Sequence, residues 1–230
     1  MDRTRLKRVR PSLQPLLTTQ KHTAILVATV KTKLLPIPTV DLVTAECREF
    51  DRENQLVEEA LRLLWTQFPH NTKSSHVLLK VLVLNRLYST RVNDIDVEPL
   101  ARHIAGLGID PLLDQGVLEV VDLITNCPGL RKYLSFAAKF CSWHKPVVYP
   151  IWDGNVRACL WAYKKQDRFA PFHNYDLWVY ESFRATIIAF RAHYHLDSLT
   201  FKELDKFLYR SGGRILRGAI DPGISSSDSP

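Results

Sequence analysis

The sequence predicts an all-α fold of about eight to ten helices. Apolar residues recur at helical spacing along most of the 230 residues, and Pro and Gly interrupt these patterns where helices should end. Extended patterns are confined to short pieces, of which Pro36–Thr39 and Val147–Trp152 stand out. The chain contains no internal repeat, so one helical domain is expected.

The first half of the chain contains three predicted helices. Gln55–Phe68 has apolar residues at helical spacing and stops at Pro69. Ser74–Thr90 is nearly apolar all round in its middle, which predicts a buried central helix. Glu98–Gly108 ends on glycines, as helix C-termini commonly do.

Five further helical patterns, joined by short loops, follow in the second half. Their segments are Pro111–Asn126, Gly129–His144, Gly154–Lys165, Tyr175–Leu196 and Thr200–Arg210. The helical domain is expected to span residues 21–220. Residues 1–20 predict a basic, partly disordered arm that could follow a DNA backbone or be a free end, and residues 221–230 predict a flexible tail.

The composition narrows the class of protein. No apolar run approaches the roughly 18 residues that cross a bilayer, and Ala24–Val30 is too short for a secretory signal. We therefore expect a cytoplasmic, nucleoid-associated protein. The four cysteines form no CxxC pair, which argues against zinc, an iron–sulfur cluster or a disulfide scaffold, so we expect neither metal nor cofactor.

Charge is distributed unevenly around the net value of +7. Residues 1–35 hold eight Lys and Arg against one acid, residues 36–60 hold seven acids against two Arg, and residues 126–217 hold fifteen basic residues against seven acids. A basic face of this kind is typical of proteins that bind a phosphate polymer, although solvated surfaces can also be basic.

One carboxylate lies where an extended stretch meets a helix. Cys127, Pro128 and Gly129 form a turn between two predicted helices, the second of which should run from about Arg131 to Trp143. The extended segment then leads to Asp153 at the start of the next helix. Helix capping is the commonest role of Asp at such a position.

This order of elements resembles the helix-hairpin-helix DNA glycosylases, the endonuclease III and 8-oxoguanine glycosylase superfamily. CPGLRK matches the hairpin, YPIWDGNVRACL matches the catalytic Asp segment, and Ser74–Ile95 is similar to the helix that leads into the groove-facing loop. The resemblance covers about residues 74–163. It implies two helical lobes with the active site between them, a monomer, and duplex DNA containing a modified base as the partner.

The resemblance assigns the catalytic chemistry to Asp153. Cleavage of an N-glycosidic bond develops an oxocarbenium ion, which a nearby carboxylate stabilises more in the transition state than in the ground state. Lys139 and Lys132, seven residues apart, are candidates for a nucleophile that forms a Schiff base with the sugar. Water is the alternative nucleophile, and solvent-facing or phosphate-binding lysines are the alternative interpretation. Arg131 stands where the family has a second hairpin glycine, which weakens the case for a phosphate held by backbone amides.

Further residues are assigned to base binding and to DNA contact. Four side chains near the catalytic segment could line a base pocket, although each is more commonly part of a core; they are Trp143, Trp152, Phe140 and His144. Tyr88, with Asn85 and Arg86, lies where the family fills the gap left by the flipped base. The remaining expected DNA contacts are Gly129, Arg131, Arg157 and Arg214, the last within SGGR, which reads either as a phosphate-binding turn or as an ordinary loop.

The sequence therefore predicts a DNA glycosylase that leaves an abasic site. Its substrate is expected to be glucosylated hydroxymethylcytosine in phage DNA, as in bacterial antiphage glycosylases resembling Brig. The alternative substrate is 8-oxoguanine, removed by a repair glycosylase with lyase activity. A non-catalytic DNA-binding protein and a helical scaffold are the alternatives from other classes.

Overall fold

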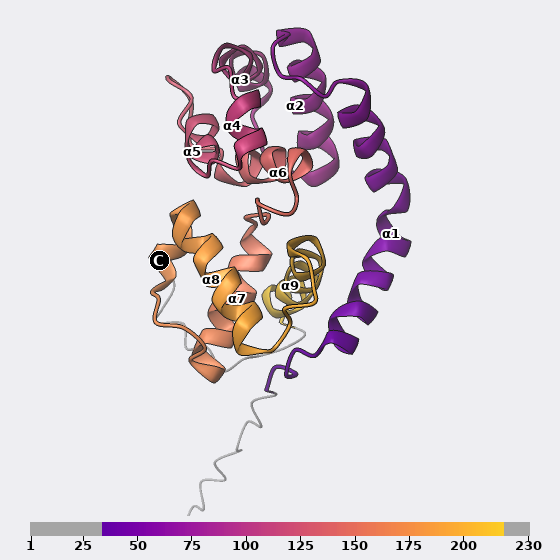
Figure 1. Cartoon of the computed structure of the whole chain (residues 1–230), viewed down its shortest axis with the longest axis vertical. Coiled ribbons are helices and arrows are strands. Elements are labelled where there is room, and N and C mark those ends of the chain that lie inside the picture. The colour runs from indigo at the N-terminus through magenta and orange to yellow at the C-terminus, as the bar shows by residue number, and fades with distance from the viewer. Residues whose placement is uncertain (1–33, 219–230) are drawn as a thin grey trace, which may run out of the picture. The chain divides into compact units, whose positions relative to one another are not determined.

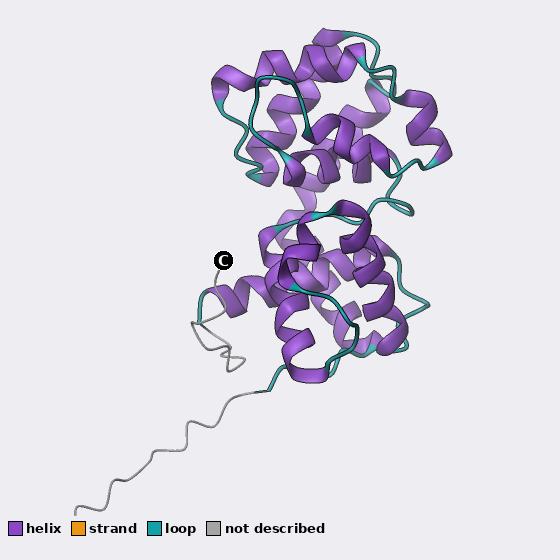
Figure 2. Ribbon diagram, turned by 90° about the vertical axis from the view of Figure 1, so that its left-hand side faces the viewer, coloured by secondary structure: helices purple, strands orange, loops and turns teal. Residues whose placement is uncertain are grey.

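Helices account for nearly all of the regular structure in the computed structural model, which describes residues 34–218. The predicted arm at residues 1–20 and the predicted tail at residues 221–230 lie outside the described residues. The all-α prediction is confirmed: the described part contains nine α-helices, one short 3-10 helix and no strand (Figure 2). The elements are α1 Val40–Gln67, α2 Ser74–Tyr88, α3 Asp94–Gly106, α4 Asp110–Gln115, α5 Glu119–Thr125, α6 Leu134–His144, α7 Gly154–Asp167, η1 Asn174–Trp178, α8 Tyr180–His193 and α9 Phe201–Leu216.

Two predicted helices are each divided into two shorter helices. The segment 111–126 forms α4 and α5, because Gly116 adopts a φ of +78° that ends α4. The segment 175–196 forms η1 and α8, which are separated by Val179 in an extended conformation. The predicted second hairpin helix begins at Leu134 rather than at about Arg131.

The first helix begins earlier than predicted. Thr39 caps α1 by accepting a hydrogen bond from the N–H of Leu42 at 3.2 Å, and Asp41 lies in the first turn. The acidic residues that follow are therefore helical. The central helix α2 is less buried than predicted, since Leu79 and Leu82 are exposed while Val81 is buried.

The helices form two groups (Figure 1). Helices α2, α3, α5 and α6 pack on one another in the first group, with α4 beside them, and α7, η1, α8 and α9 form the second. Helix α1 runs alongside both groups and contacts α2, α6 and α9. The link of residues 145–153 connects the two groups and ends at Asp153. Within residues 34–218 no helix has the length and apolar character needed to cross a bilayer.

Helix α9 passes straight through the SGGR sequence, so the predicted phosphate-binding turn is wrong. Gly212 lies against the start of α7, where a Cβ atom would stand 1.8 Å from the carbonyl oxygen of Asn155. Glycine is used here for close approach of two helices rather than for a turn.

The acidic residues near the start of the domain, on α1, form ion pairs with basic residues near its end, on α9. Glu46 on α1 pairs with Arg210 at 2.8 Å and with Arg214 at 2.7 Å, and Glu53 pairs with Arg210 at 2.5 Å. Lys206 pairs with Asp51 on the same two helices. Much of the positive charge on α9 is therefore balanced within the protein.

Candidate active site

The carboxylate predicted to be catalytic lies at the N-terminus of α7. Asp153 is the N-cap, with φ −148° and ψ 151°, and its Oδ1 accepts a hydrogen bond from the N–H of Asn155 at 2.9 Å. The predicted capping role is therefore confirmed. Its side chain is 17% exposed, so the carboxylate has limited access to solvent.

The link before Asp153 is fixed on both sides. Tyr149 donates its hydroxyl to the carbonyl of Val117 at 2.9 Å, and Tyr180 donates to the carbonyl of Pro150 at 2.8 Å. Trp152 donates its indole N–H to the carbonyl of Leu177 at 2.5 Å. These three buried bonds hold the backbone that positions the carboxylate.

Lys139 on α6 reaches the carboxylate from the other group of helices. Its Nζ lies 2.7 Å from Oδ2 of Asp153 and 3.0 Å from Oγ of Ser135, and the residue is 3% exposed. The structure thus joins two residues that the sequence assigns to one reaction. A buried ion pair of this kind is weak evidence for stability, because removing both charges from water costs much of what their attraction returns.

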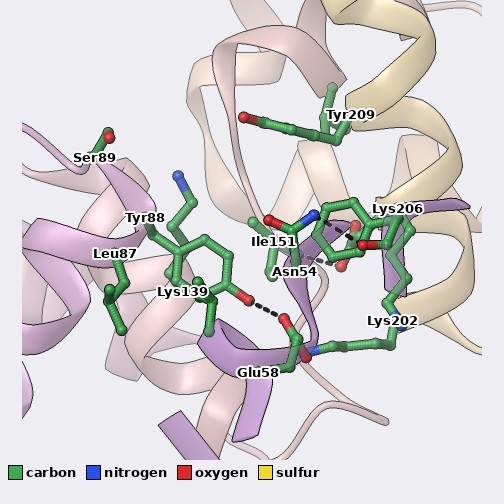
Figure 3. A pocket seen from close by; sticks show the side chains of 14 residues that line it. Asn54, Glu58, Leu87, Tyr88, Ser89, Lys139, Ile151, Lys202, Lys206 and Tyr209 are labelled. Carbon is green, nitrogen blue, oxygen red and sulfur yellow. Dashed lines mark hydrogen bonds and ion pairs between the residues drawn. The ribbon is translucent and has the colours of Figure 1, made fainter. Parts of the chain in front are cut away.

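A cavity of about 120 Å³ opens beside Lys139, between the two groups of helices (Figure 3). Its walls come from α1, the end of α2, α6, the link, α7 and α9. The lining residues are Phe50, Asn54, Val57, Glu58, Leu87, Tyr88, Ser89, Lys139, Ile151, Val156, Lys202, Asp205, Lys206 and Tyr209. This cavity lies between the two helical groups, which is where the resemblance leads us to expect an active site.

A hydrogen-bonded set of polar groups forms one wall of the cavity. Tyr88 donates its hydroxyl to Oε1 of Glu58 at 2.6 Å, and Nζ of Lys202 lies 2.8 Å from Oε2 (Figure 3). Burial, with the nearby Glu58 carboxylate, raises the pKa of Tyr88 far above its usual range. Tyr88 therefore acts as a neutral donor, and its ring lies 5.8 Å from Nζ of Lys139.

The cavity wall also contains Asp205, a carboxyl group that, like Glu58, was not predicted from the sequence. It is 4% exposed, and its Oδ2 accepts a hydrogen bond from the N–H of Ile151 at 2.8 Å. Burial raises its pKa to about 8. It lies within a strongly amphipathic helix, where one acid on the apolar face of Phe201, Leu204 and Leu208 was the available signal.

Lys132 is not brought to the cavity. It precedes α6, is exposed, and its charge acts on the carboxyl group of Asp122. The seven-residue spacing predicted a shared helix face for Lys132 and Lys139, but α6 starts only at Leu134.

The four residues predicted to form the base pocket lie elsewhere. Phe140 is fully buried in the core against Trp65, and Trp152 packs on Trp178. Trp143 and His144 line a second, larger cavity of about 610 Å³ that shares Glu58, Lys202 and Lys206 with the first.

His144 belongs to a buried polar cluster in the wall of the second cavity. Its Nε2 lies 3.2 Å from Nδ2 of Asn71 and 3.5 Å from Nζ of Lys80. Burial, together with the Lys80 charge, lowers the pKa of His144 to about 3, and burial lowers the pKa of Lys80 to about 8. Asn71 also donates to Asp110 at 2.6 Å. This cluster ties α2, α4 and α6 together.

The end of α2 combines structural and exposed residues. Asn85 fixes the following loop by accepting from Thr90 and from the N–H of Val92, both at 2.9 Å. Tyr88 is engaged in the cavity wall instead of projecting as a gap-filling side chain, while Arg86 is exposed. Leu87 and Ser89, which line the cavity, are exposed as well.

The predicted hairpin forms a turn beside the same loop. Gly129 has a φ of +78° and is exposed, and the N–H of Leu130 donates to the carbonyl of Cys127 at 3.2 Å. Arg131 is exposed, packs over the ring of Tyr133 and donates to the backbone carbonyl of Arg91. The turn and the loop after α2 therefore touch.

Two further predicted DNA contacts, Arg157 and Arg214, also have partners within the protein. Arg157 donates to Oδ1 of Asn174 at 2.9 Å and lies over the ring of Trp178. Arg214 is held by Glu46. No group of His, Cys, Asp and Glu side chains within residues 34–218 could hold a metal ion.

Comparison with known proteins gives two matches. A family model described as HI_0787_N, N-terminal domain, matches residues 42–148, a segment that contains Lys139 and ends before Asp153. An uncharacterized protein of Haemophilus influenzae is 34% identical over 143 residues, which cover 60% of this chain and 67% of that protein. No solved structure matches the chain.

Proposed function

The chain belongs to the family of this Haemophilus influenzae protein and the HI_0787_N domain, and we propose that it is a DNA glycosylase. The enzyme flips a modified base out of duplex DNA, cleaves its N-glycosidic bond and leaves an abasic site. One observation carries the proposal: the 2.7 Å pair of Lys139 and Asp153 beside a cavity between two groups of helices.

The pair supplies a carboxylate to stabilise the positive charge on the sugar and an amine to protonate the base and attack C1′. When the bond between C1′ and the base breaks, its electron pair stays with the base and C1′ becomes an oxocarbenium ion. The Asp153 carboxylate stabilises that positive charge. Lys139 then passes one proton to the base, and its nitrogen lone pair forms a bond to C1′. The resulting aminosugar opens to a Schiff base, which links glycosylase and lyase chemistry.

The surface next to the cavity supports a DNA partner. The exposed hairpin at Gly129 and the exposed side chains of Arg86, Arg91 and Arg131 lie on or beside the turn and the loop that follows α2. Exposed cations of this kind bind phosphates without reading sequence. A base flipped from DNA lying there would enter beside Ser89 and Lys139.

The second cavity favours a base with a bulky polar substituent. It adjoins the first at Glu58 and Lys202, and it offers the carboxylates of Asp110 and Asp114 beside the Trp143 ring. Polar groups beside an aromatic face are suited to a hexose. We therefore propose glucosylated hydroxymethylcytosine, and hence antiphage defence by a monomer, ahead of 8-oxoguanine repair.

The test is incubation with T-even phage DNA and with 8-oxoguanine duplexes, scoring abasic sites by alkaline strand cleavage. The wild-type protein should produce abasic sites on the phage DNA. Asp153→Asn should reduce base release by at least about 100-fold, because it removes the charge that stabilises the transition state. Its DNA binding should survive.

Other outcomes separate the alternatives. Salt-dependent DNA binding without abasic sites on any modified DNA would sink the enzyme proposal and leave a non-catalytic DNA-binding protein. Absence of salt-dependent binding would favour a helical scaffold.

A further inference from the structure

Asp205 has one oxygen whose role the fold does not explain. Oδ2 accepts the N–H of Ile151 at 2.8 Å, whereas Oδ1 is buried and has no hydrogen-bond partner among the described residues. The residue lines the cavity one turn after Lys202. A buried polar atom without a partner is costly in a folded protein and calls for an explanation, such as a ligand.

The surroundings of Asp205 favour the neutral acid. Its side chain is influenced by Lys202 on its own helix, by Asp153 and Lys139 across the cavity, and by burial, which is the largest effect. The hydroxyls of Tyr88 and Tyr180 also interact with it, and the other titratable groups on the cavity wall are Glu58, Lys206 and Tyr209. Burial raises the pKa of Asp205 to about 8, so the carboxyl group is mostly protonated at neutral pH. Since Oδ2 already accepts from Ile151, the proton belongs on Oδ1.

We propose that Oδ1 of Asp205 donates a hydrogen bond to the flipped base and stabilises the negative charge that the base acquires as it leaves. The inference rests on the proposed glycosylase function and extends it to the leaving group. No proton transfer from Asp205 is required: the electron pair of the broken C1′–N bond resides on the base, and the base takes its proton from Lys139. The donor is useful because its bond strengthens as that charge develops.

This role limits the class of substrate. The base must present an acceptor, either a ring nitrogen or an exocyclic carbonyl oxygen, toward Asp205. A modified cytosine and 8-oxoguanine both carry such acceptors. A base whose corresponding edge carries only donors should be a poor substrate, because Oδ1–H would then face another donor.

Two variants of the full-length protein test the proposal. Asp205→Asn retains an acceptor for Ile151 and places an amide donor at the position of Oδ1. Asp205→Leu removes both. With single-turnover assays on whichever modified DNA the wild-type protein cleaves, Asp205→Leu should slow base release by about 100- to 1000-fold, and Asp205→Asn by less than about tenfold. The wild-type rate should decline above about pH 8 and the Asp205→Asn rate should not.

Each contrary result has a distinct meaning. If Asp205→Asn loses as much activity as Asp205→Leu while its melting temperature is unchanged, Asp205 acts as a carboxylate and the inference is overturned. If the pH profile of Asp205→Asn retains the alkaline decline, the inference also fails, whether or not Asp205→Leu folds. In both cases wild-type base release leaves the proposed function standing; a wild-type protein that releases no base overturns both.

Discussion

Lys139 and Lys132 show how much the chemistry of a lysine depends on its surroundings. Lys139 is buried against Asp153, and Lys132 is exposed ahead of the same helix. Only the first is placed to add to a sugar in the cavity. Because both lie in one short segment of a single sequence, they form a matched pair for substitution.

We predict that Lys139→Gln abolishes the covalent complex trapped by borohydride on cleavable modified DNA, because only a Schiff base is reduced to a stable bond. Lys132→Gln should give wild-type yields of trapped complex. The measurement is gel separation of the trapped protein–DNA product. Trapping that survives in Lys139→Gln but disappears in Lys132→Gln would reverse the assignment of the nucleophile. Absence of trapping in the wild-type protein alongside base release would indicate water.

Asp153 and Lys139 were predicted as site residues because each charged group stands among apolar residues in the sequence, and the structure brings the two side chains together. Aromatic residues carry no such signal: Phe140 and Trp152 lie beside the catalytic segment and pack into the core. Tyr88 was predicted as the side chain that fills the gap in the DNA. In the structure Tyr88 instead belongs to the cavity wall, where its hydroxyl donates a hydrogen bond to Glu58. Glu58 itself lies 81 residues before Lys139, and no local pattern connects the two.

At the scale of helices, the crossing of α7 and α9 determines where Asp153 sits. Gly212 allows α9 to approach the first turn of α7 at Asn155, whose N–H also holds the Asp153 carboxylate. The position of Asp153 therefore depends on a glycine that lies 59 positions further along the chain.

We predict that Gly212→Ala lowers the free energy of unfolding by at least about 1–3 kcal/mol, because its Cβ would stand 1.8 Å from a backbone oxygen and the helices must separate. Base release should fall with it, since α7 carries Asp153. Urea denaturation and single-turnover assays measure the two effects. Gly154→Ala is the control: it adjoins Asp153, yet its Cβ would meet nothing within 4 Å. Equal behaviour of the two variants would show that the crossing does not position the site.

The periodicity of apolar residues predicted which segments are helical, but it did not predict well where each helix begins and ends. The start of α1 was missed because Glu46, Asp51 and Glu53 make its first half polar in isolation. Those acids are helical because the basic face of α9 lies against them. SGGR suggested a loop because the sequence alone does not show that α7 packs against α9 at Gly212. In both cases the missing information is a contact with a helix distant in sequence.

In the folded molecule, the exposed positive charge is distributed differently from what the counts of basic and acidic residues along the chain suggest. The basic second half suggested a face that binds a phosphate polymer, but Arg210, Arg214 and Lys206 are balanced by acids on α1. The cations left for phosphate include Arg86, Arg91 and Arg131 around the loop after α2 and the hairpin. Charge pairing within the fold thus balances part of the basic second half, while these three cations beside the cavity stay exposed.

The buried titratable groups predict how global stability depends on pH. Asp205 has a folded pKa of about 8 against an unfolded value near 3.8, so between these values the folded state holds a proton that the unfolded state lacks, and stability falls as pH rises. His144 has the opposite sign: with a folded pKa of about 3, it reduces stability as pH falls below about 6.5. Up to about pH 6.5 the effects of Asp205 and His144 on the free energy of unfolding oppose each other. Above that pH only the effect of Asp205 remains.

We therefore predict that the free energy of unfolding drops by about 2 kcal/mol between pH 6.5 and 8, at roughly 1.4 kcal/mol per pH unit. Asp205→Asn should flatten this drop, because its amide does not titrate. Above about pH 8 the buried Lys80 reverses the trend, since its lowered pKa makes the unfolded state bind the extra proton. Urea unfolding of both proteins at half-unit pH intervals measures the curves. Parallel curves for the two proteins would mean that Asp205 is not protonated in the fold, which would remove the donor on which recognition of the leaving base depends.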